Sequence, residues 1–180
     1  MGVEFEDFAL TTIRPGNPIP PNNRHFPSLL RQDKAGIRNV EPDGVVPLVV
    51  HIIPFLNPQT YADSVFYESK AVKGTLLPPS YENYQILGFL DVLGRSSARA
   101  EGEHPAIFFL TTSDVRTISR KTLTEASCRD IGVWHSIACE VTPQSGDLQM
   151  GGFRLLNRGV YFWDGRLPTS YGGPGSIGRL

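Results

Sequence analysis

The chain has 180 residues and a formal net charge of −1, which is enough for one domain with its own core and short for two. Apolar residues make up 40% and charged residues 19%, while 18 glycines and 15 prolines indicate many turns and irregular connections. The near-neutral charge excludes an overall basic field for nucleic acid or anionic lipid, so only local patches could bind them. No stretch reaches the roughly 18 apolar residues that a membrane-spanning helix needs, so no such helix is predicted.

The ends and the cysteines predict an intracellular protein. The N-terminus has no basic segment followed by an apolar one, so we expect no signal peptide. Gly2 follows the initiator, but Glu6 occupies the position where an N-myristoylation signal has Ser or Thr, so we expect no acylation. Cys128 and Cys139 lack CxxC spacing and are predicted to be reduced structural thiols.

The first 42 residues are predicted to form an arm outside the core. Residues 1–10 alternate crudely between apolar and polar types, which is typical of a strand or a short docking segment. Four prolines within 14–23 exclude a helix or a central strand and favour extended backbone. Residues 24–38 are basic, and Phe26 with its neighbours at 29–30 offers apolar groups for docking.

The globular part is predicted to span 43–167 and to begin with a strand. Residues 45–53 form a continuous β-branched run typical of a strand buried on both faces, and Pro47 places the start of that strand at an edge or a bulge. An Asn-Pro pair at 57–58 predicts the start of an amphipathic helix that runs to Lys70. After a Pro-Pro break, 80–93 predicts a second, largely buried helix.

The remaining chain predicts strands and a tail. A surface loop at 94–104 precedes strands at 106–112, 131–141, 150–156 and 160–163, with a hairpin turn at 144–147 and a Gly/Pro-rich tail at 168–180. The element order predicts an α+β fold: an antiparallel β-sheet with two helices packed on one face, preceded by an extended Pro-rich arm.

No residue pattern predicts a catalytic centre, a metal or a cofactor. His135 and Cys139 alternate on one strand face, where they form either a packed pair or a metal or Cys–His site; an enzyme remains an alternative on this basis. No G-x-S-x-G elbow occurs. The glycine pair within 150–153 lacks a following helix and a Lys-Ser/Thr, which favours a β-bulge over a phosphate loop.

Four cations gather in one stretch between predicted strands. They form either a solvated loop face or a patch that contacts the phosphates of RNA or lipid head groups. The residues are Arg116, Arg120, Lys121 and Arg129.

A PPxY motif lies between the two predicted helices. Pro78, Pro79 and Tyr81 would bind a WW domain if exposed, because the polyproline II shape is preformed. The alternative is a Pro-Pro helix entry with Tyr81 packed on the core.

Residues 45–95 resemble the first half of rhabdovirus matrix proteins. The resemblance is carried by a strand, by Pro-Gln-Thr-Tyr-Ala-Asp at 58–63 opening a helix, and by Tyr-Gln-Ile-Leu-Gly-Phe-Leu at 84–90. It implies a viral structural protein that self-associates, binds the nucleocapsid and contacts the membrane peripherally, in the host cell and in the virion. In that family a Pro-rich arm docks on a neighbouring domain, which assigns self-association to Pro18, Pro20, Pro21, Phe26, Leu29 and Leu30.

The sequence departs from that family in two places, and other functions stay open. The PPxY motif is internal rather than in the arm, and residues 1–10 are acidic rather than Lys-rich. One alternative is a jelly-roll coat protein with eight strands and few helices. Another is a host-directed virulence or adaptor protein that binds one cellular partner, such as a WW-domain protein, through Tyr81.

Overall fold

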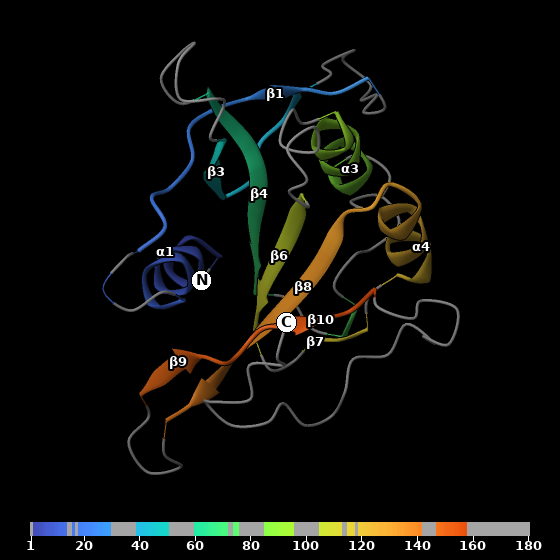
Figure 1. Ribbon diagram of the computed structural model, residues 1–180. Coiled ribbons are helices and arrows are strands. Elements are labelled where there is room, and N and C mark those ends of the chain that lie inside the picture. Colours follow the sequence, from blue (N-terminus) through green and yellow to red (C-terminus); the bar gives the residue numbers. More distant parts are fainter. Residues whose placement is uncertain are drawn as a thin grey trace.

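The structure is a computed structural model that shows an α+β fold (Figure 1). The residues that it describes are 2–13, 16, 18–29, 39–50, 60–71, 74–75, 85–95, 105–112, 115–117, 119–141 and 147–157.

A mixed β-sheet forms the centre of the molecule. Its strands lie in the order β3 (Gly44–Val50), β4 (Thr60–Lys70), β6 (Ala106–Thr111), β8 (Gly132–Glu140) and β10 (Arg154–Leu155), and β9 (Leu148–Met150) pairs with β8 as well. The pairs β4–β6 and β6–β8 are parallel, whereas β3–β4, β8–β9 and β8–β10 are antiparallel. The prediction of an antiparallel sheet is therefore wrong for its centre.

Two small strand pairs lie outside this sheet. β1 (Phe26–Pro27) pairs with β2 (Asn39–Val40) in antiparallel orientation. β5 (Gly74–Thr75) pairs with β7 (Val115–Thr117) in parallel orientation.

Helices cover both faces of the sheet. Figure 1 shows α1 (Gly2–Thr12) on one side and α3 (Leu87–Gly94) and α4 (Arg120–Cys128) on the other. α3 links β4 to β6 and α4 links β6 to β8, so both belong to parallel crossovers that advance across the sheet in the same direction. Because such crossovers share one hand, they place their helices on the same face, and the opposite face is left for α1.

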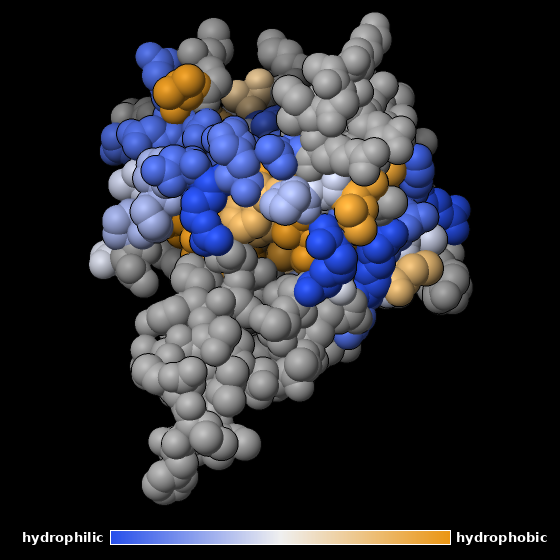
Figure 2. Space-filling view, turned by 90° about the horizontal axis from the view of Figure 1, so that it is seen from above, coloured by the Kyte–Doolittle hydropathy of each residue, from blue (hydrophilic) through white to orange (hydrophobic). Residues whose placement is uncertain are grey.

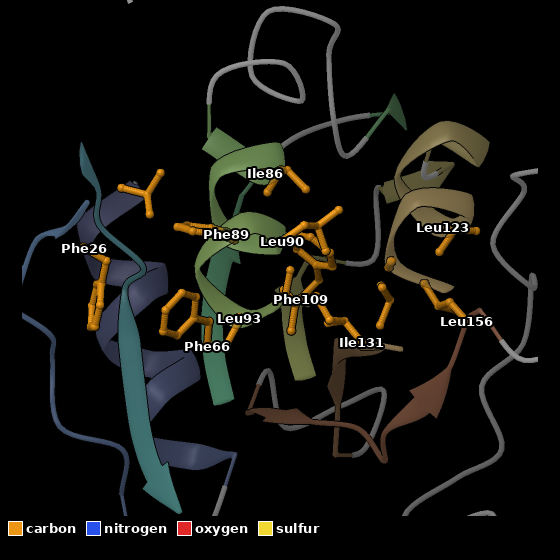
Figure 3. Packing of buried hydrophobic residues seen from close by; sticks show 14 of the residues in the cluster. Phe26, Phe66, Ile86, Phe89, Leu90, Leu93, Phe109, Leu123, Ile131 and Leu156 are labelled. Carbon is orange, nitrogen blue, oxygen red and sulfur yellow. The ribbon is translucent and has the colours of Figure 1, made fainter. Parts of the chain in front are cut away.

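The larger core lies between α3, α4 and the sheet. Phe66, Ile107, Phe109 and Val133 point to this side from the three central strands, and Figure 3 shows the α3 and α4 side chains closing over this part of the sheet. The helix side chains are fully buried, which is the main stabilising contribution of α3 and α4. They are Ile86, Phe89, Leu90, Leu93, Leu123 and Ala126.

The second core lies between α1 and the opposite face. Its most regular feature is a ladder of aromatic rings in which Tyr67, Phe108 and Trp134 are direct partners across β4, β6 and β8. The ring centroids are 4.9 Å apart for Tyr67–Phe108 and 5.8 Å for Phe108–Trp134, and both pairs are stacked. Phe153 meets Phe108 edge-on at 4.6 Å. Phe153 thus packs on the middle ring of the ladder, and the stacked pairs reinforce the strand register.

Most of the predicted strands are confirmed. β6 and β8 match the strands expected at 106–112 and 131–141, and β3 lies at the sheet edge with a register shift at Pro47. α3 confirms the second predicted helix from Leu87 onwards. The strand expected at 150–156 is divided into β9 and β10, while that expected at 160–163 lies outside the described residues.

The predicted helix at 57–70 is wrong, because residues 60–70 form β4. The Asn-Pro pair that predicted its start lies outside the described residues. From Val65 onwards the side chains alternate between the two cores: Phe66 faces α3 and Tyr67 faces α1. β4 pairs on both sides, with β3 and with β6, and this pairing overrides a local helix-start signal.

The first 42 residues are not all outside the core, which corrects that expectation. Residues 2–12 form a helix rather than a strand, and Ala9 and Leu10 are buried against the sheet. Ile19 is buried in the same cluster, and Phe26 is buried in the larger core. Of the apolar residues that predicted a strand, Phe5, Phe8 and Leu10 pack in this cluster, where the sheet supplies the partner surface, whereas Val3 is exposed.

A close approach at Gly44 gives a stability prediction. A Cβ added there would lie 2.9 Å from Ile19 Cγ2, 3.0 Å from Leu10 Cδ2 and 3.3 Å from Tyr67 Cβ. Gly44→Ala is therefore expected to lower the free energy of unfolding by about 1–3 kcal/mol, measured by denaturant unfolding. Gly94→Ala is the matched control, since its new Cβ would meet Arg129 only at 3.8 Å, and no loss of stability is expected.

Candidate functional site

The best-defined site is the place where residues 26–29 dock on the globular domain. The ring of Phe26 lies 5.0 Å from that of Phe66 in β4 and is buried in the larger core. The guanidinium carbon of Arg24 lies 5.0 Å from the centroid of the same ring. Phe26 is thus the apolar anchor of this segment, and a cation–π contact covers it.

Asp91, on α3, clamps the residues that follow the anchor. Its Oδ2 atom accepts hydrogen bonds from the backbone N–H of Leu29 (2.7 Å) and the hydroxyl of Ser28 (3.1 Å). Arg95, one helical turn later, donates to the same oxygen (2.9 Å) and to the carbonyl of Pro27 (3.0 Å). One carboxylate and one guanidinium therefore bind the backbone on both sides of Ser28. We call Phe66, Asp91 and Arg95, which receive residues 26–29, the docking clamp.

The charge of Asp91 is held in place by its donors. Burial alone would raise the pKa of Asp91, but hydrogen bonds from Arg95 and from the Leu29 N–H outweigh it and hold that pKa below its ordinary value. The carboxylate consequently remains ionised over the physiological pH range. Because both partners sit at the edge of the core, removing one would leave the other charge without its partner.

The preceding segment follows the edge of the sheet. The backbone N–H of Asn22 donates to the carbonyl of Asp43 (2.8 Å), and its side-chain amide donates to the carbonyl of Pro42 (2.8 Å). Pro21 forms an isolated bridge with Gly44, the first residue of β3. These contacts explain how a Pro-rich segment, which lacks most of its own donors, is held along an edge strand.

The residues assigned to self-association differ in how exposed their side chains are. Phe26 is buried, whereas Pro18, Pro20 and Pro21 are exposed. Leu29 docks through its backbone while its side chain is 64% exposed, and Leu30 lies outside the described residues. Seen from above, this side of the molecule shows hydrophobic atoms between hydrophilic side chains (Figure 2).

The polar part of the docking clamp was not predicted from the sequence. Asp91 falls within the second predicted helix, and Arg95 follows it at the i+4 spacing of a helical ion pair. An acidic residue in a largely buried helix, together with that spacing, could have identified the pair. No local pattern links Ser28 to α3, because 63 residues separate it from Asp91.

Three of the four predicted basic residues lie at the two ends of one helix. Residues 120–128 form a helix rather than a loop, and Ser119 caps it by accepting from the Lys121 N–H. Arg120 and Lys121 are exposed at its start. Arg129 lies at its other end, roughly 13 Å away at 1.5 Å per residue, with its Nε atom 3.8 Å from Glu125 Oε2.

The fourth basic residue, Arg116, and the PPxY motif cannot be compared with their predictions in the same way. The side chain of Arg116 in β7 lies outside the described residues, as do Pro78, Pro79 and Tyr81. The assignments of RNA, lipid or WW-domain binding to these positions stay predictions.

His135 is a buried histidine within the sheet. Its Nε2 atom lies 2.7 Å from Thr111 Oγ1, in a hydrogen bond whose direction depends on the tautomer of the imidazole. Burial lowers the pKa of His135 to about 3.

Cys139 lies four residues after His135 on β8. Cys139 is half-buried and Cys128 exposed, and both are free thiols. Within the described part of the chain, no group of three or more His, Cys, Asp or Glu side chains could hold a metal ion.

Comparison with known proteins gives no match for this fold or this sequence. No protein-family model matches the chain, and neither a curated protein nor a solved structure is similar to it. Among the described helices, none is long and apolar enough to cross a membrane.

The clamp can be tested at Asp91. Asp91→Asn removes the negative charge beside Arg95 and replaces one acceptor oxygen by an N–H₂ group, which cannot accept from the surrounding donors. The free energy of unfolding is therefore expected to fall by about 2–3 kcal/mol. Hydrogen exchange at the Leu29 amide should accelerate as the segment is released. Glu125→Gln, which breaks the partly exposed pair with Arg129, is the control and should change stability by less than about 0.5 kcal/mol. Unchanged protection at Leu29 in Asp91→Asn would contradict the clamp.

His135 predicts a loss of stability in acid. Its ordinary pKa is 6.5 and its folded value about 3, so the unfolded chain takes up a proton first as the pH falls below 6.5. Stability should then decrease by up to about 1.4 kcal/mol per pH unit from this group. Denaturant unfolding at several pH values should show a shallower slope for His135→Gln.

Proposed function

We propose that this protein is a viral, matrix-type structural protein that self-associates by placing residues 26–29 of one copy on the docking clamp of another. In this role it links nucleocapsid and membrane during assembly. The observation that carries the proposal is the way in which the docking clamp binds residues 26–29. The segment is held by one aromatic anchor, Phe26, and by one charged pair, Asp91–Arg95.

The clamp supports exchange between copies because its contacts do not depend on which chain supplies the segment. Phe26, Ser28 and Leu29 would meet the same Phe66, Asp91 and Arg95 in a second copy. Exchange of an identical element adds no unfavourable contact, and its main cost is the lost freedom of the second copy. High local concentration, as in an assembling shell, offsets that cost.

The Pro-rich residues between α1 and residues 26–29 suit such an exchange. Prolines fix the backbone in extended conformations and so limit the freedom that a bridging segment loses when it binds. The exposed side chains of Pro18, Pro20 and Leu29 provide additional apolar contacts to a neighbouring copy.

The viral assignment comes from the sequence resemblance to rhabdovirus matrix proteins over residues 45–95. The first motif was expected to open a helix, but its residues 60–63 belong to β4, so the assignment rests on the amino-acid pattern and not on the element order. In the second motif, Ile86, Phe89 and Leu90 are core residues at the start of α3 and within it. The jelly-roll alternative expects antiparallel strands throughout, whereas the described sheet has two parallel pairs at its centre.

Contact with nucleocapsid and membrane is assigned to cations at the surface of α4. Arg120 and Lys121 are exposed at its start and offer a small, local positive charge to phosphates of RNA or lipid. With a net charge of −1 for the whole chain, such binding should be weak for one copy and strengthened by assembly.

A mixing experiment tests the exchange. Asp91→Asn has an intact segment and a damaged clamp, whereas Phe26→Ala has a damaged segment and an intact Asp91. If segments exchange, an equimolar mixture restores one sound contact per pair and should form at least about threefold more dimer than either variant alone, by light scattering after size exclusion. A mixture that behaves as the sum of its components would contradict exchange.

The second part of the function is tested with the wild-type protein. Binding to anionic liposomes or to single-stranded RNA should decrease in Arg120→Gln/Lys121→Gln, which lowers the net charge by two, and weaken with salt. Arg154→Glu, at an exposed site on β10, is the control for the change in net charge. If the protein stays monomeric at high concentration and binds neither RNA nor liposomes, both parts of the proposal are wrong.

A further inference from the structure

The side chains of residues 26–29 alternate in direction where the segment lies in the docking clamp. Phe26 and Ser28 are buried, with 7% and 1% of their surface exposed, whereas Pro27 and Leu29 are exposed. The first two residues of the segment form β1, which pairs with β2 in antiparallel orientation. The segment is therefore bound as an added strand, and only its first and third side chains point into the protein.

The first inward position accommodates an aromatic ring. The centroid of Phe26 lies 5.0 Å from that of Phe66, and Figure 3 shows Phe26 at one end of the larger core. Arg24 lies over the same ring and adds a cation–π contact. A smaller side chain at this position would leave part of the core unfilled, so the site favours an aromatic residue.

The second inward position accommodates a hydroxyl group. Ser28 Oγ donates to Asp91 Oδ2 at 3.1 Å, and both residues are buried. An alanine here would lose this hydrogen bond to a charged acceptor. An anionic group would lie beside the Asp91 carboxylate and be repelled by it. The position therefore selects a small, neutral hydrogen-bond donor.

The two outward positions are held through the backbone alone. The Pro27 carbonyl accepts from Arg95 at 3.0 Å, and the Leu29 N–H donates to Asp91 Oδ2 at 2.7 Å. Neither contact depends on the side chain, and that of Leu29 is 64% exposed. A proline in place of Leu29 is the exception, because it has no N–H to donate.

We propose that the docking clamp is a recognition site for extended protein segments of the pattern aromatic–x–Ser–x, where x is any residue but the last is not proline. Residues 26–29 carry this pattern, and a different protein that exposes such a segment binds at the same place. Phosphorylation of the serine prevents this binding, because the phosphate would be buried beside the Asp91 carboxylate. The inference rests on the proposed function in one respect, namely that the clamp accepts a segment from another chain.

Peptide binding to the full-length protein tests the pattern. The probe is a fluorescein-labelled peptide with the sequence of residues 23–30, and binding is measured by fluorescence anisotropy. Phe26→Ala is the receptor, because its own segment lacks the aromatic anchor. The wild-type protein should bind the peptide at least about tenfold more weakly, since its own segment competes at high local concentration.

Changes in the peptide test which positions the clamp recognises. Peptides with Phe26→Ala, with Ser28→Ala or with phosphoserine at position 28 should each bind at least about tenfold more weakly than the parent peptide. A peptide with Leu29→Ala should bind like the parent, because that side chain is exposed.

Changes in the receptor locate the peptide on the clamp. Adding Asp91→Asn to the Phe26→Ala protein should weaken binding at least about tenfold. Adding Glu125→Gln is the matched control and should leave binding unchanged, since Glu125 belongs to a separate ion pair on α4. If Phe26→Ala does not fold, Ser28→Ala serves as the receptor, because it weakens its own segment and keeps the aromatic anchor.

The inference is overturned if the receptor binds no peptide, if the parent, Ser28→Ala and phosphoserine peptides bind equally, or if Asp91→Asn has no effect. These results differ from a failure of the proposed function. Peptide binding without exchange in the mixing experiment means that self-association is wrong and the recognition site stands. Exchange between copies without any preference for Ser28 means the reverse.

Discussion

The parallel pairing of β6 with both of its neighbours is the constraint on which the structure depends. β6 bonds to β4 on one side and to β8 on the other, so its side chains are divided between two buried faces. Parallel strands must be connected by crossovers, and these require α3 and α4. Both helices then lie on the same face, and the opposite, equally apolar face needs a cover. α1 provides that cover, which makes the N-terminal residues part of the fold.

This arrangement leaves two attachments at the periphery of the fold. α1 is held to the sheet by apolar contacts, whereas residues 26–29 are held to α3 by the charged pair Asp91–Arg95. The donors around Asp91 match its carboxylate and hold it ionised.

The docking of residues 26–29 is the feature on which the proposed assembly depends. A segment whose binding site is complete on one copy can occupy the same site on another. Because Phe26 is part of the larger core, moving this segment to another copy would open that core on one copy and rebuild it on the other.

Local patterns in the amino-acid sequence determined the strands with strong alternation, the buried helix α3 and the α+β class. They also identified Phe26 as an apolar docking residue and found no catalytic pattern. Only the tertiary structure decided three points. Residues 60–70 are a strand because β3 and β6 pair with them, residues 2–12 are a helix that covers a face, and the cations at 120–129 belong to the two ends of one helix. The Ser28–Asp91 contact could not be read from the chain, because its partners are 63 residues apart and meet only when β4 and α3 are in place.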